Sequence, residues 1–442
     1  MLEVKNRLGI VFFPAYDWAI SPTHQEREER LLYTHDQLRE EGVFDIEGLN
    51  EYRPEVAKEE DVARVHFCFP DVTAVVTPSH LISAGGAIKA ARLVMEKKEE
   101  KTFALVRPPG HHAMKVVHGN RGFCLINIEA IMIEYIREHY GPLRIAVVDT
   151  DCHHGDGTQD IYWHDPNTLF ISMHQDGRTC YPGSGFPHEF GGPGALGQTI
   201  NIPLPPTTGD EGFLYVLDHI VQPILNDFKP DLIINSAGQD NHYTDPITNM
   251  KFTAQGYALL NQRLNPDIAV LEGGYSIRGA LPYVNLGIIL AMAGLDYSFV
   301  REPDYDPLAL RSHPQIMDYI KTLSDEILNM YFNPKSEAQA GWEPGKEIIR
   351  NKNIFYDTDF IRERQKESIR LCEKCPGILK IETESTVNDL SVGIEVPLTA
   401  CRSCAEAGLG LFEEALAEKR YLYTQFINRK DKIYRQVKSA GR

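Results

Sequence analysis

The stretch RIAVVDTDCHHGDG (residues 144–157) joins a run of apolar residues to a cluster of acidic residues and histidines. An apolar run of this kind is typical of a strand that is buried on both faces, as in a parallel sheet. Similar runs occur at residues 8–13, 103–110, 168–175, 198–204, 231–240 and 267–275. Helical patterns separate several of them, at residues 79–100, 127–140 and 213–228. This alternation predicts an α/β fold with a parallel sheet.

The residues that could carry chemistry follow the ends of these predicted strands. They lie at residues 107–112, 149–156, 240 and 275. In open parallel sheets, ligands bind beyond the carboxyl ends of the strands. We therefore expect four separate loops to converge on one crevice.

The opening stretch offers a carboxylate and an imidazole close together, and these are good ligands for a divalent metal. Residues two apart on a strand point the same way, so Asp149, Asp151 and His153 can share a face or continue from it into the loop. A third ligand must come from elsewhere, and Asp240 at the end of a predicted strand is the candidate. Two carboxylates and one imidazole would leave a tetrahedral zinc one position for water. A lone Asp or His here would usually be a loop cap or a core residue, but the whole cluster would repel itself without a cation.

A pair of adjacent histidines, His111 and His112, occurs in RPPGHHA (residues 107–113). A histidine titrates near neutral pH and can exchange protons with a metal-bound water or a leaving amine. It works best when a carboxylate holds its second nitrogen, and Asp149 and Asp156 are available for that. The alternatives, a turn or an adventitious metal site, are less favoured because the prolines and the glycine fix the backbone.

The motif LEGGY (residues 271–275) follows another predicted strand. Gly273 and Gly274 permit an unusual backbone path that would aim Tyr275 over the crevice. There its phenol could donate a hydrogen bond to a developing oxyanion. A tyrosine in such a place more often serves packing, so this motif alone is a weak signal.

The eight cysteines fall into two groups. Four are scattered, as buried small hydrophobic residues usually are: Cys68, Cys124, Cys152 and Cys180. The others form two C-x-x-C pairs: Cys372, Cys375, Cys401 and Cys404. The runs at residues 377–384 and 390–399 alternate like a hairpin between these pairs. The pattern predicts a structural zinc held by four thiolates in a zinc-ribbon-like module, with a disulfide pair or free thiols as the alternatives.

Composition indicates a soluble protein that we expect to be cytoplasmic. No apolar run is long enough for a membrane helix, and the N-terminus lacks the features of a secretory signal. The net charge of −17 disfavours direct binding of nucleic acid and could favour a cationic substrate, although a well-solvated surface is the simpler interpretation. We predict four segments: a catalytic domain (1–332), a connector (333–370), the zinc-ribbon-like module (371–410) and a charged C-terminal helix (411–442).

The chain resembles the histone deacetylase and acetylpolyamine amidohydrolase superfamily over roughly residues 8–297. Seven motifs occur in the order found there: RPPGHHA (107–113), GFC (122–124), DTDCHHGDG (149–157), ISMH (171–174), YPGSG (181–185), AGQD (237–240) and EGGY (272–275). The RPPGHH and EGGY forms look most like class II deacetylases. The resemblance implies the arginase–deacetylase fold, an eight-stranded parallel sheet with helices on both faces.

The resemblance also implies a set of catalytic residues. His112 looks like the general base, and His111 like its electrostatic or acid partner. Asp156 would orient His112, and Asp149 would orient His111. Tyr275 would polarise the amide carbonyl.

Metal ions and a substrate tunnel follow from the same resemblance. It implies a catalytic zinc bound by Asp151, His153 and Asp240. It implies potassium bound, mostly through backbone oxygens, by Asp149, Asp151, His153, Ser172 and Met173, with a second site around Tyr162, Asp165 and Thr168. The tunnel would be lined by Gly122, Phe123, Tyr181 and Gly273, with Tyr181 where the family usually has Phe.

These residues predict a zinc-dependent amidohydrolase that cleaves an acyl-lysine type of amide with a metal-bound water and the histidine pair. The alternative is a small-molecule amidohydrolase acting on acetylpolyamines or a related amide. Polyamine-selective class II enzymes carry a glutamate where this chain has Ile247, which favours acyl-lysine or a neutral acylamide. A catalytically silent binding protein or an arginase-like two-metal enzyme ranks lower, because no catalytic residue is lost and no second carboxylate set occurs. The acyl preference, a possible homo-oligomer and the choice of zinc or iron stay open.

Overall fold

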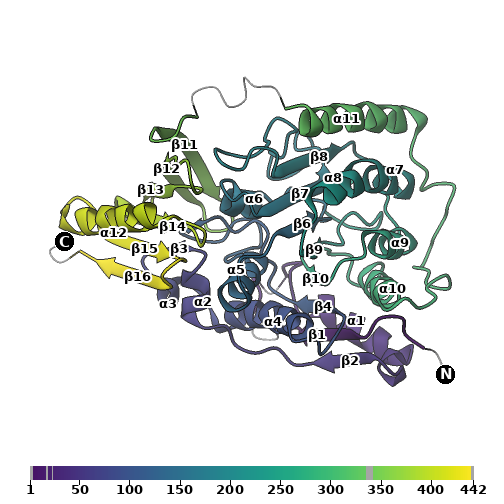
Figure 1. Cartoon of the computed structure of the whole chain (residues 1–442). Helices are drawn as coiled ribbons and strands as arrows, with labels where there is room; N and C mark the ends of the chain where they lie inside the picture. The colour runs from purple at the N-terminus through teal and green to yellow at the C-terminus, as the bar shows by residue number, and fades with distance from the viewer. Residues whose placement is uncertain (1–2, 16–17, 22, 335–341, 440–442) are drawn as a thin grey trace.

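The computed structural model describes residues 3–15, 18–21, 23–334 and 342–439. Its larger sheet has eight parallel strands in the order β2-β1-β4-β10-β9-β6-β7-β8 (Figure 1). They are β1 (Leu8–Phe13), β2 (Leu49–Tyr52), β4 (Lys101–Val106), β6 (Ile145–Asp149), β7 (Thr168–Gln175), β8 (Thr199–Leu204), β9 (Leu232–Ala237) and β10 (Ile268–Leu271). Every apolar run that predicted a strand forms one, and the eight-stranded parallel sheet is confirmed. Only the edge strand β2 was not expected, because its sequence LNEY lacks the apolar run of a buried strand.

Helices cover both faces of this sheet, and each face has its own apolar core. On one face lie α1 (Glu29–Glu40), α7 (Asp210–Val216), η2 (Leu217–Val221), α8 (Gln222–Phe228), α9 (Ala254–Leu264), α10 (Leu281–Ala293) and α11 (Pro314–Phe332). The other face is covered mainly by α2 (Glu59–Ala63), α4 (Pro78–Met95), α5 (Ile128–Tyr140) and α6 (Asp156–Tyr162). The remaining short elements are η1 (Val43–Asp45), β3 (Phe67–Cys68), α3 (Val72–Val75) and β5 (Val116–Val117). None of the helices within the described residues has the length and apolarity needed to cross a membrane.

A second sheet of six strands forms the C-terminal part, ordered β11 to β16 along the chain. Its strands are β11 (Glu347–Tyr356), β12 (Ile361–Arg370), β13 (Ile378–Ser385), β14 (Ser391–Val396), β15 (Tyr423–Asn428) and β16 (Ile433–Lys438). Neighbours are antiparallel except β14 and β15, which are parallel. Helix α12 (Arg402–Ala417) packs on this sheet through one apolar cluster.

Two expectations about this region were wrong. The connector expected at 333–370 contains the paired strands β11 and β12, and the helix expected at 411–442 ends at residue 417, before two further strands. The strand β12 (IRERQKESIR) was missed because its buried positions include two glutamates, Glu363 and Glu367. Apolar and polar residues therefore do not alternate along it as they do in an ordinary strand. The hairpin expected between the cysteine pairs is present as β13 and β14, inside a larger sheet than a zinc ribbon. The boundaries between domains stay a prediction.

Buried ion pairs join the C-terminal sheet to the larger domain. Glu395 on β14 accepts hydrogen bonds from Lys115 (2.5 Å) and Arg429 (2.5 Å). Burial alone would raise the pKa of Glu395, but Arg429 and Lys115 hold it below its ordinary value. Lys352 on β11 binds Asp160 of α6 at 2.6 Å. The C-terminal sheet is therefore fixed against the domain that carries the predicted site (Figure 1).

Candidate active site

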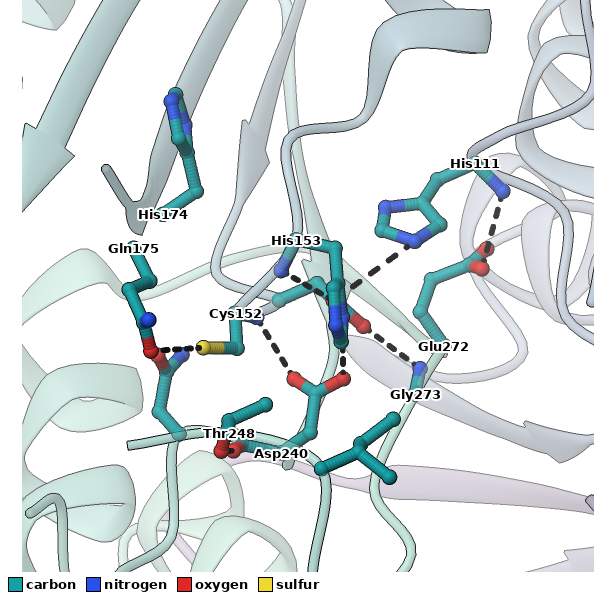
Figure 2. A network of polar contacts seen from close by, with 12 residues as sticks. His111, Cys152, His153, His174, Gln175, Asp240, Thr248, Glu272 and Gly273 are labelled. Carbon is teal, nitrogen blue, oxygen red and sulfur yellow. Dashed lines mark hydrogen bonds and ion pairs between the residues drawn. The ribbon is translucent and has the colours of Figure 1, made fainter. Parts of the chain in front are cut away.

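Asp151, His153 and Asp240 meet beyond the carboxyl ends of β6 and β9. Their ligand atoms lie within 4.8 Å of one another, and all three residues are buried. The His153 Nδ1 atom is 2.9 Å from Asp240 Oδ2 (Figure 2) and also 3.2 Å from Asp151 Oδ1. Two buried carboxylates this close to one imidazole form a donor set that fits a divalent cation.

Backbone groups fix both carboxylates of this cluster. The Gly273 amide donates to Asp151 Oδ2 at 2.7 Å, and the Cys152 amide donates to Asp240 Oδ1 at 2.7 Å. A Cβ atom at Gly273 would lie 2.4 Å from Asp240 Oδ2, so only glycine fits there. Gly273 was expected in the tunnel wall, but its amide binds Asp151 and it is absent from the described lining of the cavity.

The histidine pair lies beside the metal cluster, and each ring is held by a carboxylate. His111 Nδ1 is 3.0 Å from Asp149 Oδ2, and His112 Nδ1 is 2.8 Å from Asp156 Oδ1. Burial and the neighbouring His111 lower the pKa of His112 to about 3. Burial alone would lower the pKa of His111, but Asp151 and Asp149 hold it well above its ordinary value. A cation bound by Asp151 would offset this effect on His111.

A cavity of about 360 Å³ opens onto these residues. The described residues that line it include His111 and His112, together with His153, Phe123, Tyr181 and Tyr275. The rings of Phe123 and Tyr275 meet edge to face at 5.3 Å, and Tyr181 stands edge to face with His112 at 5.1 Å. Gly122 has a φ of +55°, and a Cβ there would lie 2.7 Å from His112 Cδ2. Gly122, Phe123 and Tyr181, three of the residues predicted to form a substrate tunnel, thus all line this cavity, and the tunnel itself stays a prediction.

The sequence is similar to proteins of known family. A model of the histone deacetylase domain matches residues 71–285. The chain is 48% identical over 324 residues to a probable deacetylase of Archaeoglobus fulgidus, covering 67% of this chain and 89% of that protein. The chain belongs to the histone deacetylase family.

One further relative and one solved structure show lower sequence identity to this chain. A histone deacetylase-like amidohydrolase of Pseudomonas aeruginosa is 33% identical over 240 residues, covering 52% of this chain and 62% of that protein. The crystal structure of the HDA15 HD domain matches with a TM-score of 0.63 and 26% identity, covering 73% of this chain and 95% of that one. The chain thus shares the deacetylase fold.

Two site residues of this deacetylase family member were missed by the sequence analysis. Arg121 donates to Asp156 Oδ2 through Nε at 2.8 Å, so it shares the carboxylate that holds His112. Glu272 accepts from the His111 amide at 3.0 Å (Figure 2) and from the Gly110 amide at 2.7 Å, so it joins the loop of the histidine pair to the loop after β10. Arg121 directly precedes the GFC motif, and Glu272 is the first residue of EGGY. Their places in the sequence were the only sign of a role in the site.

Three of the residues predicted to bind potassium lie on two adjacent strands, and Asp151 and His153 follow the end of β6. Asp149 and Ser172 are register partners on β6 and β7, and Met173 follows Ser172. At the second expected site, the side chains of Asp165 and Thr168 accept hydrogen bonds from Arg137 at 2.6 and 2.8 Å. Potassium at either place stays a prediction.

The four cysteines of the C-x-x-C pairs also come together. Their sulfur atoms lie within 4.8 Å of one another, and all are free thiols. The Sγ atoms of Cys372 and Cys401 are 3.8 Å apart. A zinc tetrahedron with Zn–S bonds of about 2.3 Å has edges of about 3.8 Å, so the cluster fits such an ion.

Replacing Cys372 by serine is expected to release one metal ion per chain and to lower the melting temperature by about 5 °C or more. The cluster joins the end of β12 to the start of α12, so the loss loosens the C-terminal sheet. Elemental analysis and thermal unfolding measure both effects. Cys68→Ser, a buried thiol outside the cluster, is the control for metal content, which it should leave unchanged. An unchanged metal content in Cys372→Ser would contradict the assignment.

Proposed function

We propose that this protein is a zinc-dependent amidohydrolase that removes an acyl group from an acylated amine of the acyl-lysine type. The observation that carries the proposal is the meeting of two sets of residues at one cavity. Asp151, His153 and Asp240 form the buried donor set, and the carboxylate-held histidine pair lies beside it. The four-cysteine cluster would hold a second, structural zinc, and potassium would bind near Asp149.

Asp151, His153 and Asp240 would hold the catalytic zinc. When bound, it supplies Lewis acidity that polarises the amide carbonyl and acidifies water. The residues of this chain would do the rest of the chemistry, which is proton transfer, orientation of the amide and stabilisation of charge.

His112 would take the proton from water. Its Nδ1 atom is bound to Asp156, so its Nε2 atom is the one available as the acceptor. The lowered pKa keeps the ring neutral, as a base must be. Arg121 keeps the Asp156 carboxylate ionised, because it holds the pKa of that group well below its usual range against the effect of burial.

His111 and Tyr275 would act on the amide itself. His111, held by Asp149, would assist protonation of the leaving amine. Tyr275 would donate its phenolic proton as a hydrogen bond to the carbonyl oxygen as negative charge develops there. Burial raises the pKa of Tyr275 well above its ordinary value, which keeps the phenol protonated as a donor.

Hydrolysis of two substrate classes tests this proposal. An acetyl-lysine peptide and a monoacetylated polyamine are compared by release of free amine, with the metal content measured per chain. Turnover of the peptide with about two zinc ions bound per chain supports the acyl-lysine assignment. Turnover confined to the acetylated polyamine would move the assignment to a small-molecule amidohydrolase. An intact metal content with neither substrate cleaved would contradict the proposal for these acetylated amines.

A further inference from the structure

The turn between β11 and β12 reaches from the C-terminal sheet into the active-site cavity. Asp357, the first residue of this turn, is among the residues that line the cavity. Its Oδ1 atom accepts hydrogen bonds from the Gly122 amide at 2.9 Å and from the Tyr181 hydroxyl at 2.9 Å. The turn lies outside residues 71–285, which the family model matches. This part of the wall is therefore built by a segment beyond the matched deacetylase core.

The same turn holds the loop that carries Gly122. Thr358 donates to the Gly122 carbonyl, and Asp359 accepts from the Asn120 amide at 2.6 Å. Arg121 donates to the Phe355 carbonyl at 2.6 Å. Successive residues of the loop are thus bound to the hairpin, so the position of Asp357 in the cavity is well defined.

Asp357 differs in charge from the rest of the cavity wall. Among the described residues that line the cavity, it is the only carboxylate, and none is a lysine or arginine. Asp357 is partly buried and, within the described chain, no cation lies within ion-pair distance of it. The nearby Arg121 pairs directly with Asp156, and its charge acts on Asp357 only from beyond ion-pair distance. The carboxylate therefore lines the cavity without a direct ion-pair partner among the described residues.

We propose that Asp357 determines substrate specificity by binding a positively charged group of the substrate, close to the amide that is cleaved. The inference rests on the proposed amide hydrolysis and names the substrate class for it. Ile247 also lines this cavity but carries no charge. The carboxylate in the cavity wall comes instead from Asp357, on the turn between β11 and β12. The cationic group can come from a flanking residue of an acetylated peptide or from the second amine of an acetylated diamine.

The test compares matched substrates that differ in one charge. One pair is an acetyl-lysine peptide with a flanking arginine and the same peptide with glutamine there. The other pair is a monoacetylated diaminobutane and N-butylacetamide. The wild type is expected to prefer the charged member of at least one pair, and the pair preferred tells which source of the cation the site accepts.

Asp357→Asn keeps an oxygen that can accept from Gly122 and Tyr181 but removes the charge. We expect the preference, taken as the ratio of kcat/KM for the charged and neutral members, to fall about tenfold through a higher KM for the charged member. Asp357→Ala removes the acceptor as well, so kcat should also fall for every substrate. Asp359→Asn neutralises a carboxylate on the same turn outside the described cavity lining, and should keep the preference.

An unchanged preference in Asp357→Asn, with kcat lowered equally for both members, would overturn the specificity role and leave a structural one. Absence of a charge preference in an active wild type would overturn it too. If the metal-loaded wild type cleaves none of the four amides, the proposed hydrolysis fails and the specificity role fails with it.

Discussion

Replacing Asp240 by asparagine is expected to reduce amide hydrolysis by about three orders of magnitude. Asp240 Oδ2 lies 2.9 Å from His153 Nδ1, and a neutral amide cannot replace its charge in a buried donor set. One metal ion per chain should be lost, while the ion expected at the four cysteines stays. Steady-state kinetics and elemental analysis of the same preparation measure both effects.

Asp231→Asn is the matched control for that change. Asp231 precedes β9, at the end of the strand opposite Asp240, and its carboxylate is exposed and accepts from the Arg144 amide at 2.8 Å. It should retain both metal ions and full activity. Wild-type activity and metal content in Asp240→Asn would show that Asp240 is not a ligand and would contradict the proposed site.

Replacing Tyr275 by phenylalanine is expected to lower kcat by about 100-fold to 1000-fold while the metal content stays unchanged. The ring can keep its edge-to-face contact with Phe123 at 5.3 Å and its place under Arg30 at 4.9 Å. Only the hydroxyl is lost, so the effect reports the hydrogen bond to the developing oxyanion. KM should change little, because that bond strengthens only as the reaction proceeds.

Tyr297→Phe provides the control, because it removes an exposed hydroxyl that donates to Gln262 at 2.8 Å, away from the described cavity lining. It should leave kcat as in the wild type. A decrease below tenfold in Tyr275→Phe would mean that another group stabilises the oxyanion. A large rise in KM with kcat retained would mean that Tyr275 binds substrate rather than the transition state.

The sequence predicted the core of the fold well because buried parallel strands have a plain signature. The apolar runs became strands, and the alternation with helices gave the parallel sheet. The strands β11 and β12 were missed for the opposite reason. Their inward residues include Glu363 and Glu367, which are buried beside His118 and His164 of the larger domain. These partners are distant in the sequence, so the residues around the two glutamates give no sign that the glutamates are buried.

The site was predictable where its residues stand close together in the sequence or in an ordered set of motifs. Asp151 and His153 are two residues apart, and Asp240 ends a predicted strand. Asp357 was not predictable, because it bonds to Gly122 across 235 positions and belongs to a turn with no motif. Only the pairing of the C-terminal sheet with the larger domain brings it into the cavity.

The central claim is that a metal at Asp151, His153 and Asp240 is required for amide hydrolysis, and metal removal tests it most directly. Release of free amine from an acetyl-lysine peptide and from a monoacetylated diamine is measured with chelator-treated protein, before and after addition of zinc. The account predicts a loss of about 100-fold or more that zinc restores in the wild type but not in Asp240→Asn. Full activity in protein shown to contain no metal would contradict it.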